Sequence, residues 1–247
     1  MNWIIRLKEE MAVSSNAHFI TLTYNQENIP TDRMGYTYVS KEDCQNFFKR
    51  LRYNIGSNHK IRYYLAAEYG PATFRPHYHA IIFNMPSDDP IKTRREIAKA
   101  WSKDNKPMGF IQCEPVTENR IGYVTGYCMD KGKDTKSGKK VFALQSQGLG
   151  KAYLKKKNRV AWHKEAPLDN MYYPLENGKK VALPRYYRNK ILDSEISREV
   201  LRGISEKDAH LHYIKNKDRI HEQFGEDVKN IKVLEKRDKL KRKMRKL

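Results

Sequence analysis

The first half of the chain alternates short runs rich in β-branched and aromatic residues with amphipathic stretches of helical spacing. Strand-like runs lie at residues 19–24, 61–67, 78–83 and 108–113. Helices are expected at residues 40–56, 89–101 and 117–131. The first six elements follow the order strand–helix–strand–strand–helix–strand, which is the split β-α-β pattern. We therefore expect an α+β fold, with a ferredoxin-like or RRM-like antiparallel sheet (βαββαβ) that has helices on one face and the other face open.

The chain is strongly basic, with 49 Lys and Arg residues against 29 Asp and Glu residues, for a net charge of +20. This excess favours a polyanionic partner. Because no apolar run long enough to cross a bilayer accompanies it, nucleic acid is the expected partner and a membrane is not. The apolar start of the chain is too short for a signal peptide, so we expect an intracellular protein. The three cysteines are widely spaced and form no C-x-x-C pair, which indicates neither a disulfide framework nor a cysteine zinc site.

Composition divides the chain into three expected parts. Residues 1–132 hold the predicted sheet, residues 133–204 form a basic, tyrosine-rich extension packed on this core, and residues 205–247 form a basic helical region. Apolar residues in the last part recur at helical spacing, at Ile220, Phe224, Val228, Ile231 and Leu234. Four tyrosines of the extension lie among Lys and Arg residues: Tyr172, Tyr173, Tyr186 and Tyr187. They either stack on bases beside cations that contact phosphate, or pack the extension against the sheet.

Two histidines, His77 and His79, open the third predicted strand. Residues i and i+2 of a strand project from the same face, so both imidazoles can bind one cation. Glu68, at the end of the strand expected to pair with this one, supplies a third ligand, and the mixed nitrogen–oxygen set suits Mg²⁺ or Mn²⁺. His210 and His212 have the same spacing but lie in a predicted helix, where such positions diverge by roughly 200°. The alternative for the strand pair is two ordinary surface or core histidines.

Two tyrosines, Tyr123 and Tyr127, lie four residues apart in the predicted helix 117–131, and Lys131 follows one turn later. A tyrosine hydroxyl has a pKa near 10 and is a weak nucleophile. A cation on the target phosphate and a nearby lysine would lower the barrier to its attack. Attack on a DNA phosphodiester would give a 5′-phosphotyrosine and a free 3′-hydroxyl. The alternative is a tyrosine pair on an exposed helix face with no chemical role.

Together, the histidine pair and the tyrosine pair resemble the motifs of the HUH endonucleases, and more closely those of the replication initiators of microviruses of the gokushovirus type. Order and spacing agree over about residues 17–190. The stretches that carry the resemblance are 19–24, 47–52, 68–70, 74–83, 123–127 and 183–187.

This resemblance implies a rolling-circle replication initiator, an enzyme that nicks and rejoins single-stranded DNA at an origin. Residues 1–132 would then be the nicking domain. The metal, Mg²⁺ or Mn²⁺, would be held by His77, His79 and Glu68, and the tyrosine pair would supply the nucleophiles, assisted by Lys131. Two arginines that adjoin the motifs are expected to contact DNA, Arg75 and Arg120. The expected partners are single-stranded origin DNA and a helicase or other replication machinery of a bacterial host, in whose cytoplasm the protein would act.

Two other classes of protein fit part of the pattern. An RRM-like binder without enzymatic activity would stack bases on the open sheet face and need no metal, but it does not explain the histidine pair or the Tyr/Lys helix. A transposase or plasmid relaxase would use the same chemistry in another biological role. The tyrosine pair weighs against single-tyrosine transposases, and relaxases usually carry a third histidine, for which the sequence near His77 offers no candidate.

Overall fold

The computed structural model describes residues 2–70, 73–127, 137–175 and 178–215 of the chain. The chain divides into two compact units, Met1–Tyr153 and Leu154–Leu247, and each unit is described by itself. The apolar repeat expected from Ile220 to Leu234 lies outside the described residues.

The first unit contains the predicted sheet. Its helices are α1 (Asn2–Met11), α2 (Lys41–Ile55), α3 (Pro90–Ala100) and α4 (Glu118–Tyr127). Its strands are β1 (Ala17–Thr23), β2 (Arg62–Tyr69), β3 (Pro76–Phe83), β4 (Ser102–Lys103), β5 (Lys106–Pro107), β6 (Ile111–Pro115) and β7 (Ala143–Gln145). Five strands form one antiparallel sheet in the order β6-β1-β3-β2-β7. Without the edge strand β7, this is the order of the ferredoxin-like split β-α-β fold, so the predicted α+β fold is confirmed.

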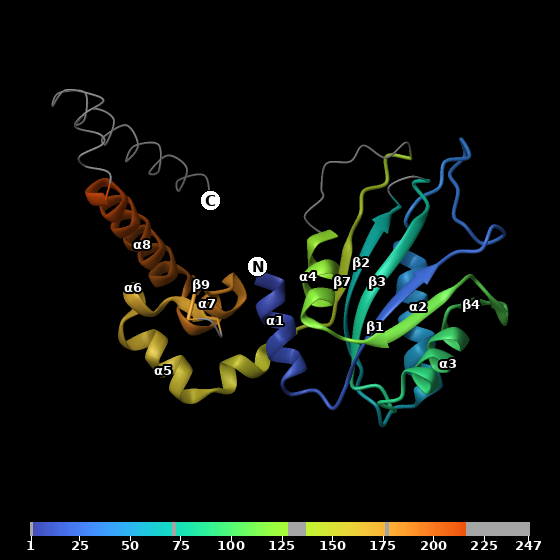
Figure 1. The fold of residues 1–247 in the computed structure, drawn as a ribbon, viewed down its shortest axis with the longest axis horizontal. Helices are drawn as coiled ribbons and strands as arrows, with labels where there is room; N and C mark the ends of the chain where they lie inside the picture. The colour runs from blue at the N-terminus through green and yellow to red at the C-terminus, as the bar shows by residue number, and fades with distance from the viewer. Residues whose placement is uncertain (1, 71–72, 128–136, 176–177, 216–247) are drawn as a thin grey trace. The chain divides into compact units, whose positions relative to one another are not determined.

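Helices cover both faces of this sheet. Figure 1 shows α2 and α3 on one side and α4 on the other. The first face packs into a large buried cluster with α2 and α3, and the second forms a smaller cluster that includes Phe19, Tyr64, Ile81, Leu7 of α1 and Ile121 and Val124 of α4. The prediction of an open face was therefore wrong, because α1 and α4 both pack where the sequence pattern left the sheet uncovered.

The two helices of the first face begin where the sequence predicted. The side chain of Ser40 accepts a hydrogen bond from the backbone N–H of Asp43 (3.1 Å), and that of Asp89 accepts one from Ile91 (2.8 Å). These contacts satisfy backbone donors that the first turn of a helix leaves unpaired. The buried side of α2 consists of Cys44, Phe47, Phe48 and Leu51, which recur at helical spacing. Capping and periodicity together therefore define this helix.

The fourth strand of the core begins later than predicted, at Ile111 instead of Met108. Gly109 approaches β1 so closely that a Cβ atom there would lie 2.0 Å from the carbonyl oxygen of Thr23. The residues before it form the hairpin β4–β5. The pairing with β1 nevertheless reaches past the assigned strand, because the backbone N–H of Thr23 donates to the carbonyl oxygen of Phe110 (3.0 Å).

This close approach predicts a large stability effect of Gly109→Ala. The new methyl group would meet backbone atoms, which must shift, so we expect the free energy of unfolding to fall by about 2–3 kcal/mol. Gly126→Ala in α4 is the matched control, since a Cβ there meets nothing within 4 Å and alanine favours a helix. Urea denaturation measures both. Equal midpoints for wild type and Gly109→Ala would contradict the packing described here.

The N-terminal helix α1 was not predicted. Its apolar side chains follow helical spacing, at Trp3, Ile4, Leu7 and Met11, and this was the signal that would have found it. Its last turn is fixed by Glu10, which is only 4% exposed. The Glu10 carboxylate accepts hydrogen bonds from Arg62 and from the backbone N–H of Gly150 (2.7 Å). A buried carboxylate needs such partners, so this contact ties the helix to β2 and to the segment after β7.

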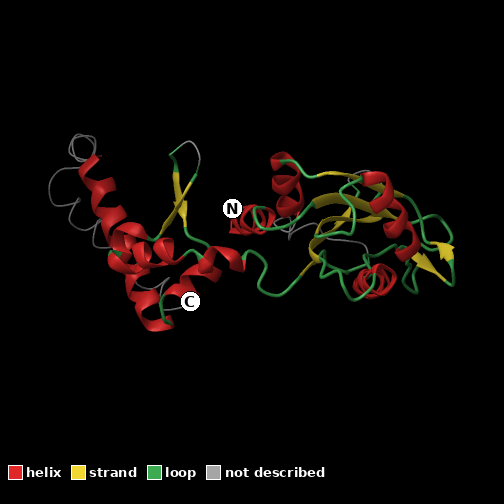
Figure 2. Cartoon of the chain, turned by 90° about the horizontal axis from the view of Figure 1, so that it is seen from below, coloured by secondary structure: helices red, strands yellow, loops and turns green. Residues whose placement is uncertain are grey.

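The second unit is mainly helical, with one short hairpin (Figure 2). From the boundary onward its elements are η1 (Lys151–Lys155), α5 (Lys157–Glu165), α6 (Pro167–Asn170), β8 (Tyr172–Pro174), β9 (Lys180–Ala182), α7 (Arg185–Ile191) and α8 (Ser194–Lys215). The helix predicted around His210 is confirmed, since α8 contains it. Tyr187 is buried, so it packs within its own unit and is not available for base stacking. Tyr172 lies 5.1 Å from the ring of Trp162 and 4.4 Å below the ammonium of Lys180. For the partly buried tyrosines, base stacking stays a prediction.

Candidate metal centre

Strand pairing brings the three predicted ligands together. β2 and β3 pair antiparallel with Glu68 opposite His77 and Ala66 opposite His79. Paired residues share a face of the sheet, and alternate residues of one strand do too, so all three ligand side chains project to the side that carries α4. Both histidines lie inside β3, which begins at Pro76, two residues earlier than predicted.

The ligand atoms converge on one another. The Oε2 atom of Glu68 lies 3.1 Å from Nε2 of His77 and 3.2 Å from Nε2 of His79. One ligand atom from each of the three residues falls within 4.8 Å of the others. Such a cluster of two imidazoles and one carboxylate is the mixed donor set expected from the sequence.

The far nitrogens of both rings are held by neighbouring groups. The carbonyl oxygen of Arg75 lies 3.2 Å from Nδ1 of His77, and because a carbonyl can only accept, this nitrogen carries the proton. In the neutral ring, Nε2 then presents a lone pair to the Glu68 carboxylate. Nδ1 of His79 lies 3.1 Å from the hydroxyl of Thr21. Outer contacts of this kind fix the orientation and tautomer of metal-binding histidines.

Burial keeps His79 neutral. The ring is 5% exposed and lies 5.7 Å from the stacked ring of Phe19. Desolvation, together with the neighbouring His77, lowers the pKa of His79 to about 3. A neutral imidazole is the form that binds a metal ion. Two lone pairs and a carboxylate that face one space repel each other unless a cation lies between them, so the residues fit a divalent cation.

Tyr123 lies directly beside this cluster. Its ring centroid is 5.1 Å from that of His79 and 6.3 Å from that of Phe19, both in edge-to-face contact. The helix is held in this position by Ile121 and Val124, which are buried against the sheet. Tyr123 itself is 47% exposed. The arrangement therefore places one solvent-accessible phenol next to the ligand set.

The second tyrosine and the lysine are placed less completely. Tyr127 is the last residue of α4, one turn after Tyr123. Its side chain, like the whole of Lys131, lies outside the described residues. The predicted helix 117–131 is thus described from Glu118 to Tyr127.

The two arginines expected to contact DNA make contacts within the protein. Arg75 donates to the carbonyl oxygen of Tyr24 (2.8 Å) and to the side chain of Gln26 (3.0 Å). Arg120 donates to the carbonyl oxygen of Pro115 (2.6 Å) and lies 5.5 Å above the ring of Phe19. Their expected role in DNA binding stays a prediction.

Sequence reasoning missed two residues of the centre, Thr21 and Phe19. Thr21 pairs with His79 in the register of β1 and β3, and Phe19 lies two residues before it on the same face. The signal was available in the alternation of β1, since every second residue of this strand faces the histidines. It could not be used without knowing that β1 lies beside β3.

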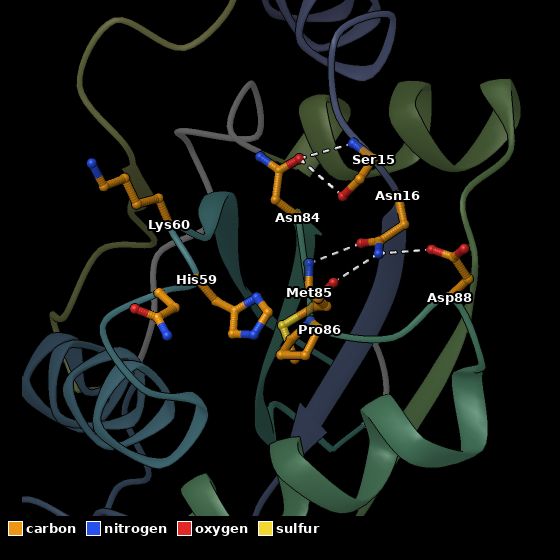
Figure 3. A pocket seen from close by; sticks show the side chains of 9 residues that line it. Ser15, Asn16, His59, Lys60, Asn84, Met85, Pro86 and Asp88 are labelled. Carbon is orange, nitrogen blue, oxygen red and sulfur yellow. Dashed lines mark hydrogen bonds between the residues drawn. The ribbon is translucent and has the colours of Figure 1, made fainter.

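A separate pocket of about 420 Å³ lies beyond the end of β3 that is opposite the histidines (Figure 3). Its side chains hold two loops together. Asn16 donates to the carbonyl oxygen of Met85 and to the carboxylate of Asp88, both at 2.8 Å. Asn84 accepts a hydrogen bond from the backbone N–H of Ser15 (2.9 Å). The pocket is therefore a polar junction between the start of β1 and the end of β3, and not part of the metal centre.

The fold and the ligand set define a ferredoxin-like domain with a candidate metal centre, and comparison with known proteins agrees. Residues 17–132 match the model of the family of replication-associated proteins that is described by its member ORF2. The matched segment contains the three ligands and both tyrosines.

Two relatives come from phages. The chain is 29% identical over 207 residues to the replication-associated protein VP4 of Bdellovibrio phage phiMH2K, an alignment that covers 75% of this chain and 61% of that protein. It is 28% identical over 235 residues to the replication-associated protein ORF2 of Spiroplasma virus 4, which covers 87% of this chain and 67% of that protein. The chain thus spans about two thirds of the length of these relatives. No solved structure gives a significant match.

The similarity to phage replication-associated proteins confirms the resemblance to a microvirus-type rolling-circle initiator. In the parts of the chain that the structure describes, no helix combines the length and the apolar character needed to span a bilayer.

Proposed function

We propose that this protein initiates rolling-circle replication by nicking single-stranded origin DNA through attack of a tyrosine on a phosphodiester, in the presence of a divalent metal ion. The single observation that carries the proposal is the position of Tyr123, half exposed and in ring contact with His79 of the ligand cluster. The similarity to phage replication-associated proteins supports the biological role.

The bond changes follow from the geometry of Tyr123. Its phenolic oxygen attacks the phosphorus, the bond from phosphorus to the 3′ oxygen breaks, and that oxygen takes up a proton and leaves as a 3′-hydroxyl. The phenol loses its proton, and the downstream strand stays attached as a 5′-phosphotyrosine. One phosphate ester replaces another, so the bond energy is retained and the 3′-hydroxyl can attack in reverse to reseal the strand.

Glu68, His77 and His79 are the residues that would hold the metal ion, Mg²⁺ or Mn²⁺. When bound, such a cation polarises the phosphate and offsets its negative charge. The chain contributes the orientation of the ligands. The Arg75 carbonyl and the Thr21 hydroxyl fix the two rings, and burial of His79 keeps its ring neutral.

Tyr127 and Lys131 complete the proposed machinery. In a helix, residues four apart lie on one face, so Tyr127 is positioned to attack a second junction while the first cut end stays on Tyr123. Lys131, one turn further along the sequence, would favour the phenolate form. A pair of nucleophiles allows repeated cutting and joining without release of a free 5′ end.

The remaining parts of the proposal concern partners and organisation. The net charge of +20 favours binding of the DNA backbone, with Arg75 and Arg120 as contacts near the cut. Residues 1–132 carry the nicking chemistry, with residues 133–204 and 205–247 as basic extensions. The protein would act in the cytoplasm of a bacterial host together with its helicase.

Thr21 offers a test of the metal centre that does not depend on cleavage. Thr21→Val keeps the shape of the side chain and removes the hydroxyl that lies 3.1 Å from Nδ1 of His79. We expect the affinity for Mn²⁺ to fall about 10- to 100-fold, the usual effect of losing an outer contact to a metal ligand. Titration followed by electron paramagnetic resonance measures it, and Thr37→Val, in an exposed loop away from β1, is the control. Unchanged affinity would show that Thr21 does not orient a ligand.

The proposal is separated from a non-enzymatic, RRM-like binder by a cleavage assay. The protein is incubated with a pool of single-stranded oligonucleotides of random sequence, with Mn²⁺ or with a chelator, and the products are sequenced. We expect cuts at one preferred sequence, only with Mn²⁺, and 5′ ends blocked by protein. Binding of the pool without any cut would favour the binder.

A further inference from the structure

The sheet face that carries the metal centre is covered unevenly. Along β1, Phe19 is 6% exposed beneath α4, whereas Thr21 and Thr23, further towards the end where His77 lies, are partly exposed. Along β6, which pairs with β1 on the side away from β3, Gln112 is exposed. The helices therefore leave one part of the face uncovered, next to the ligand cluster.

An exposed aromatic ring lies in this uncovered part. Phe110 is 74% exposed, although it precedes Ile111, which is buried in the cluster under α2 and α3. Because neighbouring residues of a strand point to opposite faces, the ring of Phe110 is directed to the face of the metal centre. Its carbonyl oxygen accepts hydrogen bonds from the backbone N–H (3.0 Å) and the hydroxyl (3.2 Å) of Thr23, so its backbone is fixed on β1.

The register places this ring at a defined distance from the ligands. Thr23 is opposite His77, and Thr21 is opposite both His79 and Gln112. β6 is two strands away from β3, and neighbouring strands are about 4.8 Å apart, so the side chains of β6 lie about 10 Å from the histidines. Stacked nucleotides rise about 3.4 Å each along a strand, so roughly three nucleotides cover this distance.

We propose that Phe110 and Gln112 form the subsite that binds the bases next to the cleaved phosphate. Phe110 stacks on one base, and the amide of Gln112 hydrogen-bonds to the edge of a base and selects its identity. Stacking on an exposed aromatic side chain tolerates any base, whereas a side-chain amide offers a donor and an acceptor that match some base edges and not others. The subsite thus determines where the strand is cut, and this inference rests on the proposed nicking function.

The test separates binding from cleavage. The random single-stranded pool is bound in the presence of a chelator, where no cut is expected, and bound sequences are counted. The same pool is cut with Mn²⁺. We expect Phe110→Ala to weaken binding about tenfold and to raise KM with little change in kcat, while Phe110→Trp stays close to wild type. Gln112→Ala should reduce the base preference about tenfold at one position near the cut and leave other positions unchanged.

The matched control is Tyr53→Ala. Tyr53 is an aromatic residue of α2, on the other side of the sheet, and is 88% exposed. Because neither ring is buried, both truncations should cost little folding stability. Tyr53→Ala should therefore leave binding and base preference as in wild type.

Each outcome points to one part of the account. Wild-type and Phe110→Ala proteins that bind the pool equally, or a Gln112→Ala protein with an unchanged preference at every position, would overturn the subsite. A wild-type protein that enriches sequences through Phe110 and Gln112 but never cuts them would keep the subsite and overturn the nicking function.

Discussion

Tyr123→Phe is expected to lower the rate of the first cut by at least about a thousandfold, because it removes the attacking oxygen and nothing else. The phenylalanine ring keeps the edge-to-face contacts with His79 and Phe19, so the fold and the metal affinity should stay as in wild type. Cleavage of the preferred oligonucleotide with Mn²⁺, followed on a denaturing gel, measures the effect.

Tyr127→Phe is the matched variant for this prediction. It removes the same atom one helical turn away, and we expect it to cut once at a nearly normal rate but to fail in joining a second strand. Tyr53→Phe, on the other side of the sheet, should have no effect. If Tyr123→Phe cuts at the wild-type rate while Tyr127→Phe does not, the order of the two nucleophiles proposed here is reversed.

His77→Ala is expected to abolish cleavage while leaving DNA binding intact. His77 is one of the three converging ligands and is only partly buried, so its loss should spare the fold. We expect the affinity for Mn²⁺ to fall by more than about a hundredfold, since even outer partners of a ligand contribute about 10- to 100-fold. Calorimetric titration with Mn²⁺ and binding of the oligonucleotide pool measure the two properties separately.

His59→Ala is the control for the histidine substitution. His59 is exposed and lines the pocket at the far end of the sheet, so metal binding and cleavage should both be unchanged. Normal Mn²⁺ affinity in His77→Ala would mean that the convergence of Glu68, His77 and His79 has a purely structural role.

The ligand cluster could be predicted from the sequence because it depends on local rules. His77 and His79 alternate in one strand, and Glu68 lies at the end of the neighbouring strand, so a hairpin alone brings them together. The starts of α2 and α3 were likewise predictable from Ser40 and Asp89, whose caps act within a few residues.

Features that depend on distant parts of the chain could not be predicted. The cover of the second sheet face includes α1, whose Arg6 donates to the carbonyl oxygen of Leu149 at the other end of the unit. The contact of Tyr123 with His79 required knowing which face α4 packs on. The late start of β6 follows from the approach of Gly109 to Thr23, and nothing in the local pattern indicates it.

Mass spectrometry of the protein after reaction with the oligonucleotide pool and Mn²⁺ tests the central claim most directly. Digestion with protease and nuclease should leave a nucleotide on the peptide that contains Tyr123, linked through its phenolic oxygen. No such adduct should form in the double variant Tyr123→Phe, Tyr127→Phe. Undiminished cutting by that double variant, with no protein-linked DNA, would contradict the account.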